Sequence, residues 1–81
     1  MHNLLMPRVA EFEGIVVYIY FNEHVPPHFH AVCGDDEAVI GIESIALMEG
    51  SLPAAKLKRA LRWASDNQDL LRAKWAEITG K

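Results

Sequence analysis

The strongest constraint on the fold of this 81-residue chain is a single change of hydrophobic period near Gly50. Before Gly50, β-branched and aromatic residues dominate runs such as IVVYIYF, which are typical of strands. After Gly50, one mostly apolar stripe runs at alternating spacings of four and three residues, the pattern of an amphipathic helix. The stripe consists of Leu57, Leu61, Ala64, Gln68, Leu71, Trp75 and Ile78. The order of these patterns predicts an α+β fold: a small antiparallel sheet of three to five strands, followed by two C-terminal helices packed on one face.

Two turn sequences divide the first part of the chain. Glu13 and Gly14 separate two strand-like runs, and they indicate either a two-residue hairpin turn or a bulge in one long strand. Residues 34–36, Gly-Asp-Asp, separate HFHAVC from EAVIGIE and predict a second hairpin. A last short strand is expected over IALME. The run IVVYIYF is apolar on both faces, which favours a central place in the sheet.

The C-terminal part is expected to form two helices. Ser51 is a candidate N-cap for the first helix. A single helix over residues 53–79 would be about 40 Å long, which is long for so small a domain. Ser65 and Gln68 match a capping box, so we expect a break near residues 65–67. The alternative is one long helix that pairs with another chain.

The composition indicates a single globular domain over residues 1–81. Hydrophobic residues make up 51% of the chain and charged residues 23%. A domain of this size has little spare core stability, so a homodimer or burial against a partner is expected. The single cysteine, Cys33, excludes an internal disulfide and fits a reducing cytosol. No apolar stretch approaches the roughly 18 residues of a membrane span, and the N-terminus lacks signal-peptide character, so a cytoplasmic location without membrane contact is expected.

The charges are unevenly distributed along the chain. Residues 1–52 carry one basic and eight acidic residues, whereas residues 53–81 carry seven basic and three acidic residues. A bipolar surface of this kind would suit an acidic partner or a phosphate on its helical side. The simpler interpretation is a solvated helix surface rich in Lys and Arg.

The segment HVPPHFH, residues 24–30, carries three of the four histidines of the chain. If a strand begins after the second proline, His28 and His30 point to one face and Phe29 points to the other. The two prolines stiffen the approach to this strand, which helps to hold side chains in place. His24 precedes the prolines and would fold back toward the pair. We therefore expect a functional cluster of His24, His28 and His30.

Two chemistries suit this cluster, and the sequence leaves both open. As metal ligands, His24, His28 and His30 would bind a divalent ion such as zinc and leave a coordination position open. As an acid–base pair, His28 and His30 would cleave RNA through its own 2′-hydroxyl, with Arg59 or Arg62 stabilising the phosphate charge. A third alternative is that the histidines only bond to the backbone or to a partner. Whether the protein is an enzyme therefore stays undecided at this point.

Several segments of the chain resemble the bacterial family named domain of unknown function 4160 (DUF4160). The segments are MPRVAEFEGIVVYIYFNEHVPPHFHA, AVIGIE, GSLP and RWASDNQDLLRAKW, which together span nearly the whole chain. The most specific block is HVPPHFHA, and the resemblance carries over only His24, Pro26, Pro27, His28, Phe29 and His30.

This resemblance implies a small cytosolic protein, often encoded beside a second small domain of unknown function, DUF2442. Such pairs resemble type II toxin–antitoxin modules, in which a chain of the present kind would be the toxin. The resemblance therefore implies a protein antitoxin as partner and growth inhibition as the outcome. It assigns no chemistry to the histidines.

Overall fold

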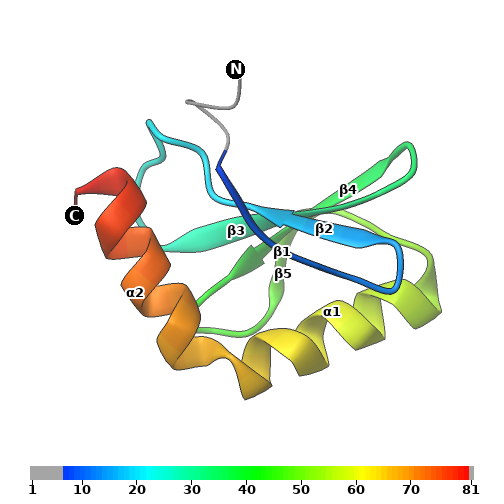
Figure 1. The fold of residues 1–81 in the computed structure, drawn as a ribbon. Helices are drawn as coiled ribbons and strands as arrows, with labels where there is room; N and C mark the ends of the chain where they lie inside the picture. The colour runs from blue at the N-terminus through cyan, green and yellow to red at the C-terminus, as the bar shows by residue number, and fades with distance from the viewer. Residues whose placement is uncertain (1–6, 81) are drawn as a thin grey trace.

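The computed structural model describes residues 7–80, which form a five-stranded antiparallel sheet followed by two helices (Figure 1). The elements are β1 (Arg8–Phe12), β2 (Ile15–Tyr18), β3 (His28–Cys33), β4 (Asp36–Gly41), β5 (Leu47–Gly50), α1 (Ala54–Asp66) and α2 (Gln68–Thr79). The strands lie in the sheet in the order in which they occur in the chain, and every neighbouring pair is antiparallel. The α+β prediction is confirmed, and the five strands are the upper limit of the three to five that were expected.

The first hairpin turn lies where the sequence places it. Glu13 and Gly14 have φ values of 49° and 79°, so both central residues have the positive φ of a type I′ turn, whose twist matches that of the paired strands. The alternative of a bulge at this position is wrong, because the irregularity lies in β1, between Arg8 and Ala10. The central place expected for IVVYIYF is also wrong, since β3 occupies the middle of the sheet.

The helical part is broken in two, as expected, but neither predicted cap is used. The break lies at Asn67, and no side chain caps the start of either helix. Gln68 instead donates its side-chain N–H to the carbonyl of Ile42, so it bonds to the sheet rather than back to the helix start. Ser51 lies too early to cap α1, which begins at Ala54 after Pro53. The alternative of one long helix is excluded.

The hydrophobic core lies between the helices and one face of the sheet (Figure 1). Its fully buried residues from the strands, and from the positions directly after β2 and β4, are Ile15, Val17, Ile19, Phe29, Ala31, Ala38, Ile40 and Ile42. The helices contribute Ala60, Ala64, Leu71 and Trp75. This packing leaves alternate strand residues on the opposite face, which α2 reaches only at the start of β3, where Trp75 lies against His28.

The uncovered face carries the histidine strand. Val16 pairs with Val32 across it, and Tyr18 pairs with His30. Val39 lies next to His30 on the other side. These valines and Tyr18 are half-buried. Neither α1 nor α2 has the length and apolar character needed to span a membrane.

Candidate functional site

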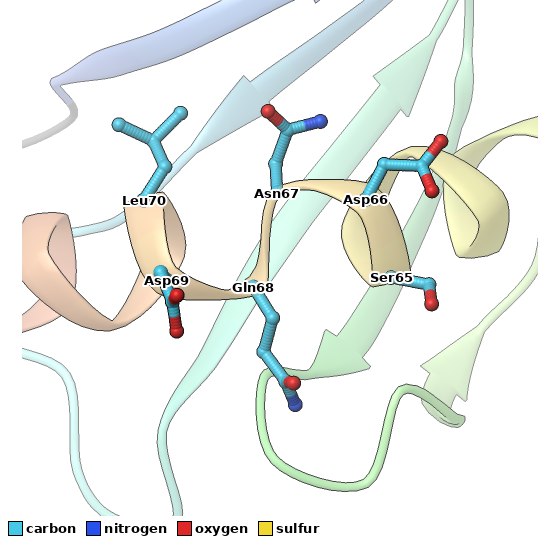
Figure 2. A pocket seen from close by; sticks show the side chains of 6 residues that line it. All are labelled: Ser65, Asp66, Asn67, Gln68, Asp69 and Leu70. Carbon is cyan, nitrogen blue, oxygen red and sulfur yellow. The ribbon is translucent and has the colours of Figure 1, made fainter.

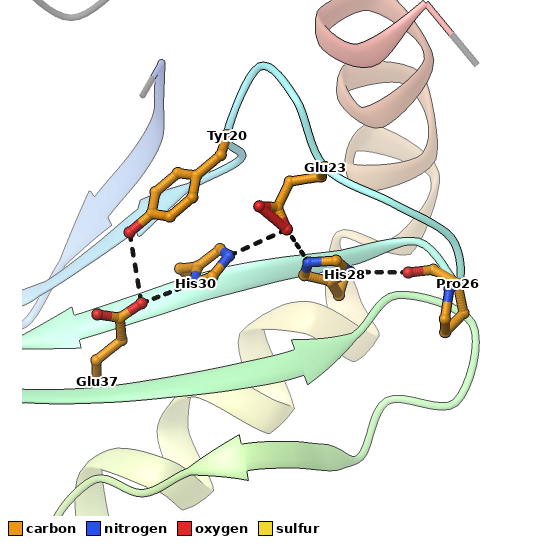
Figure 3. Close-up of polar contacts among 6 residues, drawn as sticks. All are labelled: Tyr20, Glu23, Pro26, His28, His30 and Glu37. Atoms are coloured by element: carbon orange, nitrogen blue, oxygen red, sulfur yellow. Dashed lines mark hydrogen bonds and ion pairs between the residues drawn. The ribbon is translucent and has the colours of Figure 1, made fainter. Parts of the chain in front are cut away.

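Two histidines and one glutamate converge at the start of β3 (Figure 3). His28 and His30 project from the same face of the strand, as their spacing of two predicts. Glu23 reaches them from the connection between β2 and β3, residues 19–27. Its Oε1 atom contacts the Nε2 atom of His28 closely and lies 3.4 Å from the Nε2 atom of His30. The loop and the strand thus bring three potential ligand atoms to one place.

The remaining ring nitrogens each face an oxygen that accepts a hydrogen bond. His28 Nδ1 lies 2.8 Å from the backbone carbonyl of Pro26, and His30 Nδ1 lies 2.7 Å from the Oε2 atom of Glu37. A carbonyl oxygen and a carboxylate accept hydrogen bonds, so the tautomer with the proton on Nδ1 lets each ring donate to its oxygen. In that tautomer, both Nε2 lone pairs point toward Glu23.

Aromatic rings enclose the cluster on two sides. Tyr20 stacks on His30 with ring centroids 4.0 Å apart and planes 11° from parallel. The indole of Trp75, from α2, lies 5.3 Å from the ring of His28. The side chains of His28, His30 and Glu23 are 12%, 11% and 16% exposed, so the cluster is partly withdrawn from water and still open to solvent.

Tyr20 also joins the polar network. Its hydroxyl lies 3.4 Å from the Oε2 atom of Glu37, which bonds to His30 (Figure 3). Burial raises the pKa of the Tyr20 hydroxyl, and the negative charge of Glu37 adds to the shift. The hydroxyl therefore stays protonated and donates to the carboxylate.

His24 does not belong to this cluster. It is exposed in the loop, and the third group beside His28 and His30 is its neighbour Glu23. The backbone path of the connection between β2 and β3 decides which of these two adjacent side chains turns inward. Glu23 is close to the histidines in the sequence. Residues in a loop do not alternate regularly between two faces, so the sequence could not predict which of Glu23 and His24 points toward them.

The two arginines expected at the cluster lie elsewhere. Arg59 forms an ion pair with Glu13 at the turn between β1 and β2, where its Nε atom lies 3.0 Å from both carboxylate oxygens. Arg62 is exposed on α1 and makes no ion pair with any residue in the described range 7–80. Helix α1 packs on the face of the sheet opposite to the histidines, so it cannot present either guanidinium to them.

A shallow hollow at the junction of the helices is a separate feature (Figure 2). Its lining consists of Ser65, Asp66, Asn67, Gln68, Asp69 and Leu70. None of these residues belongs to the cluster, and Gln68 is already engaged with the carbonyl of Ile42. The hollow follows from the break between α1 and α2.

Comparison with known protein families matches residues 14–76 to a domain of unknown function, DUF4160. The chain belongs to the DUF4160 family. The matched region contains Glu23, His28, His30 and Glu37, so the whole cluster lies inside the DUF4160 domain. No curated protein and no solved structure matches the chain.

Proposed function

We propose that this DUF4160 protein is a metal-binding domain in which Glu23, His28 and His30 hold one divalent transition-metal ion. The observation that carries the proposal is geometric: one ligand atom from each residue lies within 4.8 Å of the other two. An ion bound at about 2.0–2.2 Å keeps its ligand atoms within roughly 4.4 Å of one another. The three side chains therefore need only small adjustments to bind the same ion.

The electrostatics of the cluster favour a cation between the three groups. Two imidazole lone pairs and a carboxylate oxygen would repel one another if nothing positive lay between them. With the proton of each ring on Nδ1, the lone pairs of both Nε2 atoms face the same Glu23 oxygen, which lies 3.4 Å from His30 Nε2. A divalent ion satisfies all three groups at once.

The outer hydrogen bonds have the pattern of a metal centre. Histidines that bind metals usually donate their other ring N–H to a carboxylate or a backbone carbonyl, which fixes the tautomer and the ring orientation. His28 uses the carbonyl of Pro26 in this way, and His30 uses the carboxylate of Glu37. Both histidines are thus held with the coordinating nitrogen turned inward.

The ligand types indicate which ions suit the site. Imidazole nitrogens favour zinc, iron, nickel or copper over magnesium and calcium, which take oxygen ligands. Two histidines and one carboxylate leave positions open for water or a substrate, whereas structural zinc sites are closed by four protein ligands. The donor set therefore fits a reactive or exchangeable centre better than a purely structural one.

The test uses protein purified without a histidine tag. Elemental analysis and calorimetric titration with zinc, manganese and nickel should show one ion per chain. Glu23→Gln and the double substitution His28→Ala, His30→Ala should abolish this binding. His24→Ala is the matched control, because it removes an adjacent exposed imidazole and should leave the affinity unchanged. An absence of bound metal together with no thermal shift on adding these ions would refute the proposal.

For the biological role, we propose the toxin-like component of a type II toxin–antitoxin module, working in the cytoplasm with a protein antitoxin. The uncovered sheet face supports a protein partner, since the half-buried Val16, Val32 and Val39 lie together on it. RNA is the less supported target, because Arg59 and Arg62 do not lie at the cluster. Growth arrest on induced expression is expected. A folded His28→Ala, His30→Ala variant that is still fully toxic would contradict a role for the cluster.

A further inference from the structure

We infer that Glu37 and Tyr20 are positioning residues of the metal centre, which hold His30 in the orientation that presents Nε2 to the ion. The inference rests on the proposed metal site and adds a second layer of residues to it. Neither residue belongs to the group of three potential ligands. Both act through the ring of His30.

Glu37 fixes one rotation of the His30 ring. The torsion between the Cβ and the ring of a histidine is broad and roughly two-fold, so the ring by itself does not select which nitrogen points inward. The bond of 2.7 Å from Nδ1–H to Glu37 Oε2 makes that selection. Glu37 itself is anchored, because its backbone carbonyl accepts a hydrogen bond from the Ser51 N–H at 3.1 Å.

Tyr20 supports the same arrangement in two ways. Its ring lies almost parallel to the imidazole at 4.0 Å, which limits tilting of the His30 ring. Its hydroxyl, 3.4 Å from Glu37 Oε2, helps to keep the carboxylate in place. Figure 3 shows Tyr20, from the connection after β2, and Glu37, from β4, joined to each other beside His30, while Glu23 lies between His30 and His28.

The two histidines differ in how they are held, and this difference makes the inference testable. His28 depends on a backbone carbonyl, that of Pro26, which a side-chain substitution does not remove. His30 depends on the side chain of Glu37, which is 44% exposed and is replaceable without opening the core. Loss of Glu37 should therefore release His30 and leave His28 in place.

The experiment compares zinc affinities by calorimetry in wild-type protein and in four variants. Glu37→Leu should weaken binding about 10–100-fold, the usual effect of losing an outer partner of a metal-bound histidine. Glu37→Gln keeps an oxygen acceptor and should bind more tightly than Glu37→Leu. Tyr20→Leu loses the stacking ring and should also weaken binding. Glu49→Leu is the control, because Glu49 is an exposed glutamate on the neighbouring strand β5 with no bond to the cluster.

A second measurement separates positioning from a general loss of structure. Long-range proton–nitrogen NMR spectra of the zinc-bound protein identify which ring nitrogen of His30 binds the ion. Nε2 should bind in the wild type, and a mixture of Nδ1 and Nε2 should appear in Glu37→Leu, while His28 keeps Nε2 in both proteins.

The outcomes distinguish this inference from the proposed function. If wild-type protein binds no zinc, the metal site itself is refuted. If wild-type protein binds zinc and Glu37→Leu binds equally well with Nε2 of His30, the positioning role is overturned. Equal losses in Glu37→Gln and Glu37→Leu would also overturn it, because the carboxylate charge alone would then account for the effect.

Discussion

The ring of His28 lies 5.3 Å from the indole of Trp75, so the cluster at the start of β3 touches the C-terminal helix directly. Trp75 is only 4% exposed and belongs to the core. His28 begins the middle strand of the sheet, and Trp75 lies in the last helix. The contact therefore joins the candidate metal site to the packing of α2.

This contact predicts that Trp75 reports metal binding. Adding nickel or copper, which quench nearby fluorophores, should reduce the tryptophan emission of the wild-type protein. Trp75→Phe should lose this quenching, and Trp63→Phe should retain it, because Trp63 packs against Phe12 and Phe29 on the other face of the sheet. Equal quenching in both variants would show that the ion does not bind near His28.

Phe29 should contribute much of the stability of the sheet. It is fully buried between the two histidine positions, and its ring lies 6.0 Å from that of Trp63. Phe29→Ala should reduce the free energy of unfolding by about 3–5 kcal/mol, measured by urea denaturation. Phe21→Ala makes the same chemical change at a loop position that is 51% exposed, and it should have little effect. Similar losses in the two variants would contradict the packing described.

Gly50 should tolerate no side chain. Its φ is 70°, and a Cβ atom there would overlap the carbonyl oxygen of Glu37. Gly50→Ala should therefore lower the free energy of unfolding by clearly more than the roughly 1–2 kcal/mol that a left-handed backbone alone costs a residue with a side chain. Gly34→Ala is the matched control, since Gly34 has φ 61° and a Cβ atom there would meet nothing within 4 Å. Thermal denaturation of the two variants should show the larger loss at Gly50, and the reverse order would contradict the close approach of β4 and β5.

The pair of Glu13 and Arg59 should make stability depend on acid pH. The hydrogen bond from Arg59 lowers the pKa of Glu13 below its ordinary value. The pair therefore stabilises the fold above the ordinary pKa of glutamate, and this contribution disappears as the pH falls through the lowered value.

Glu13→Gln tests this pH dependence. Its melting temperature should be below that of the wild type at neutral pH, and the difference should shrink as the pH falls through the lowered pKa of Glu13. Added salt should also reduce the difference, because both partners are exposed. A difference that stays constant with pH would show that the charge of Glu13 is not the cause.

Local patterns accounted for most of the fold. The change of period near Gly50 predicted the order of sheet and helices, and Glu13-Gly14 predicted the first turn, because only certain residues suit the positive φ of a two-residue hairpin. The predicted capping box at Ser65 and Gln68 does not form, because the side chain of Gln68 bonds to the sheet instead. The carbonyl of Ile42 lies within 2.8 Å of the Gln68 side chain, and that partner comes from 26 residues away.

The sequence by itself determined that His28 and His30 share a face, because side chains alternate along any strand. Only the tertiary structure decided which other side chains lie next to these two histidines. The path of the loop turns Glu23 inward and His24 outward, the register of β3 and β4 brings Glu37 to His30, and the packing of α1 on the opposite face keeps Arg59 away. The distance in space between the residues of each contact depends on how whole strands, loops and helices pack. A local sequence pattern does not determine that distance.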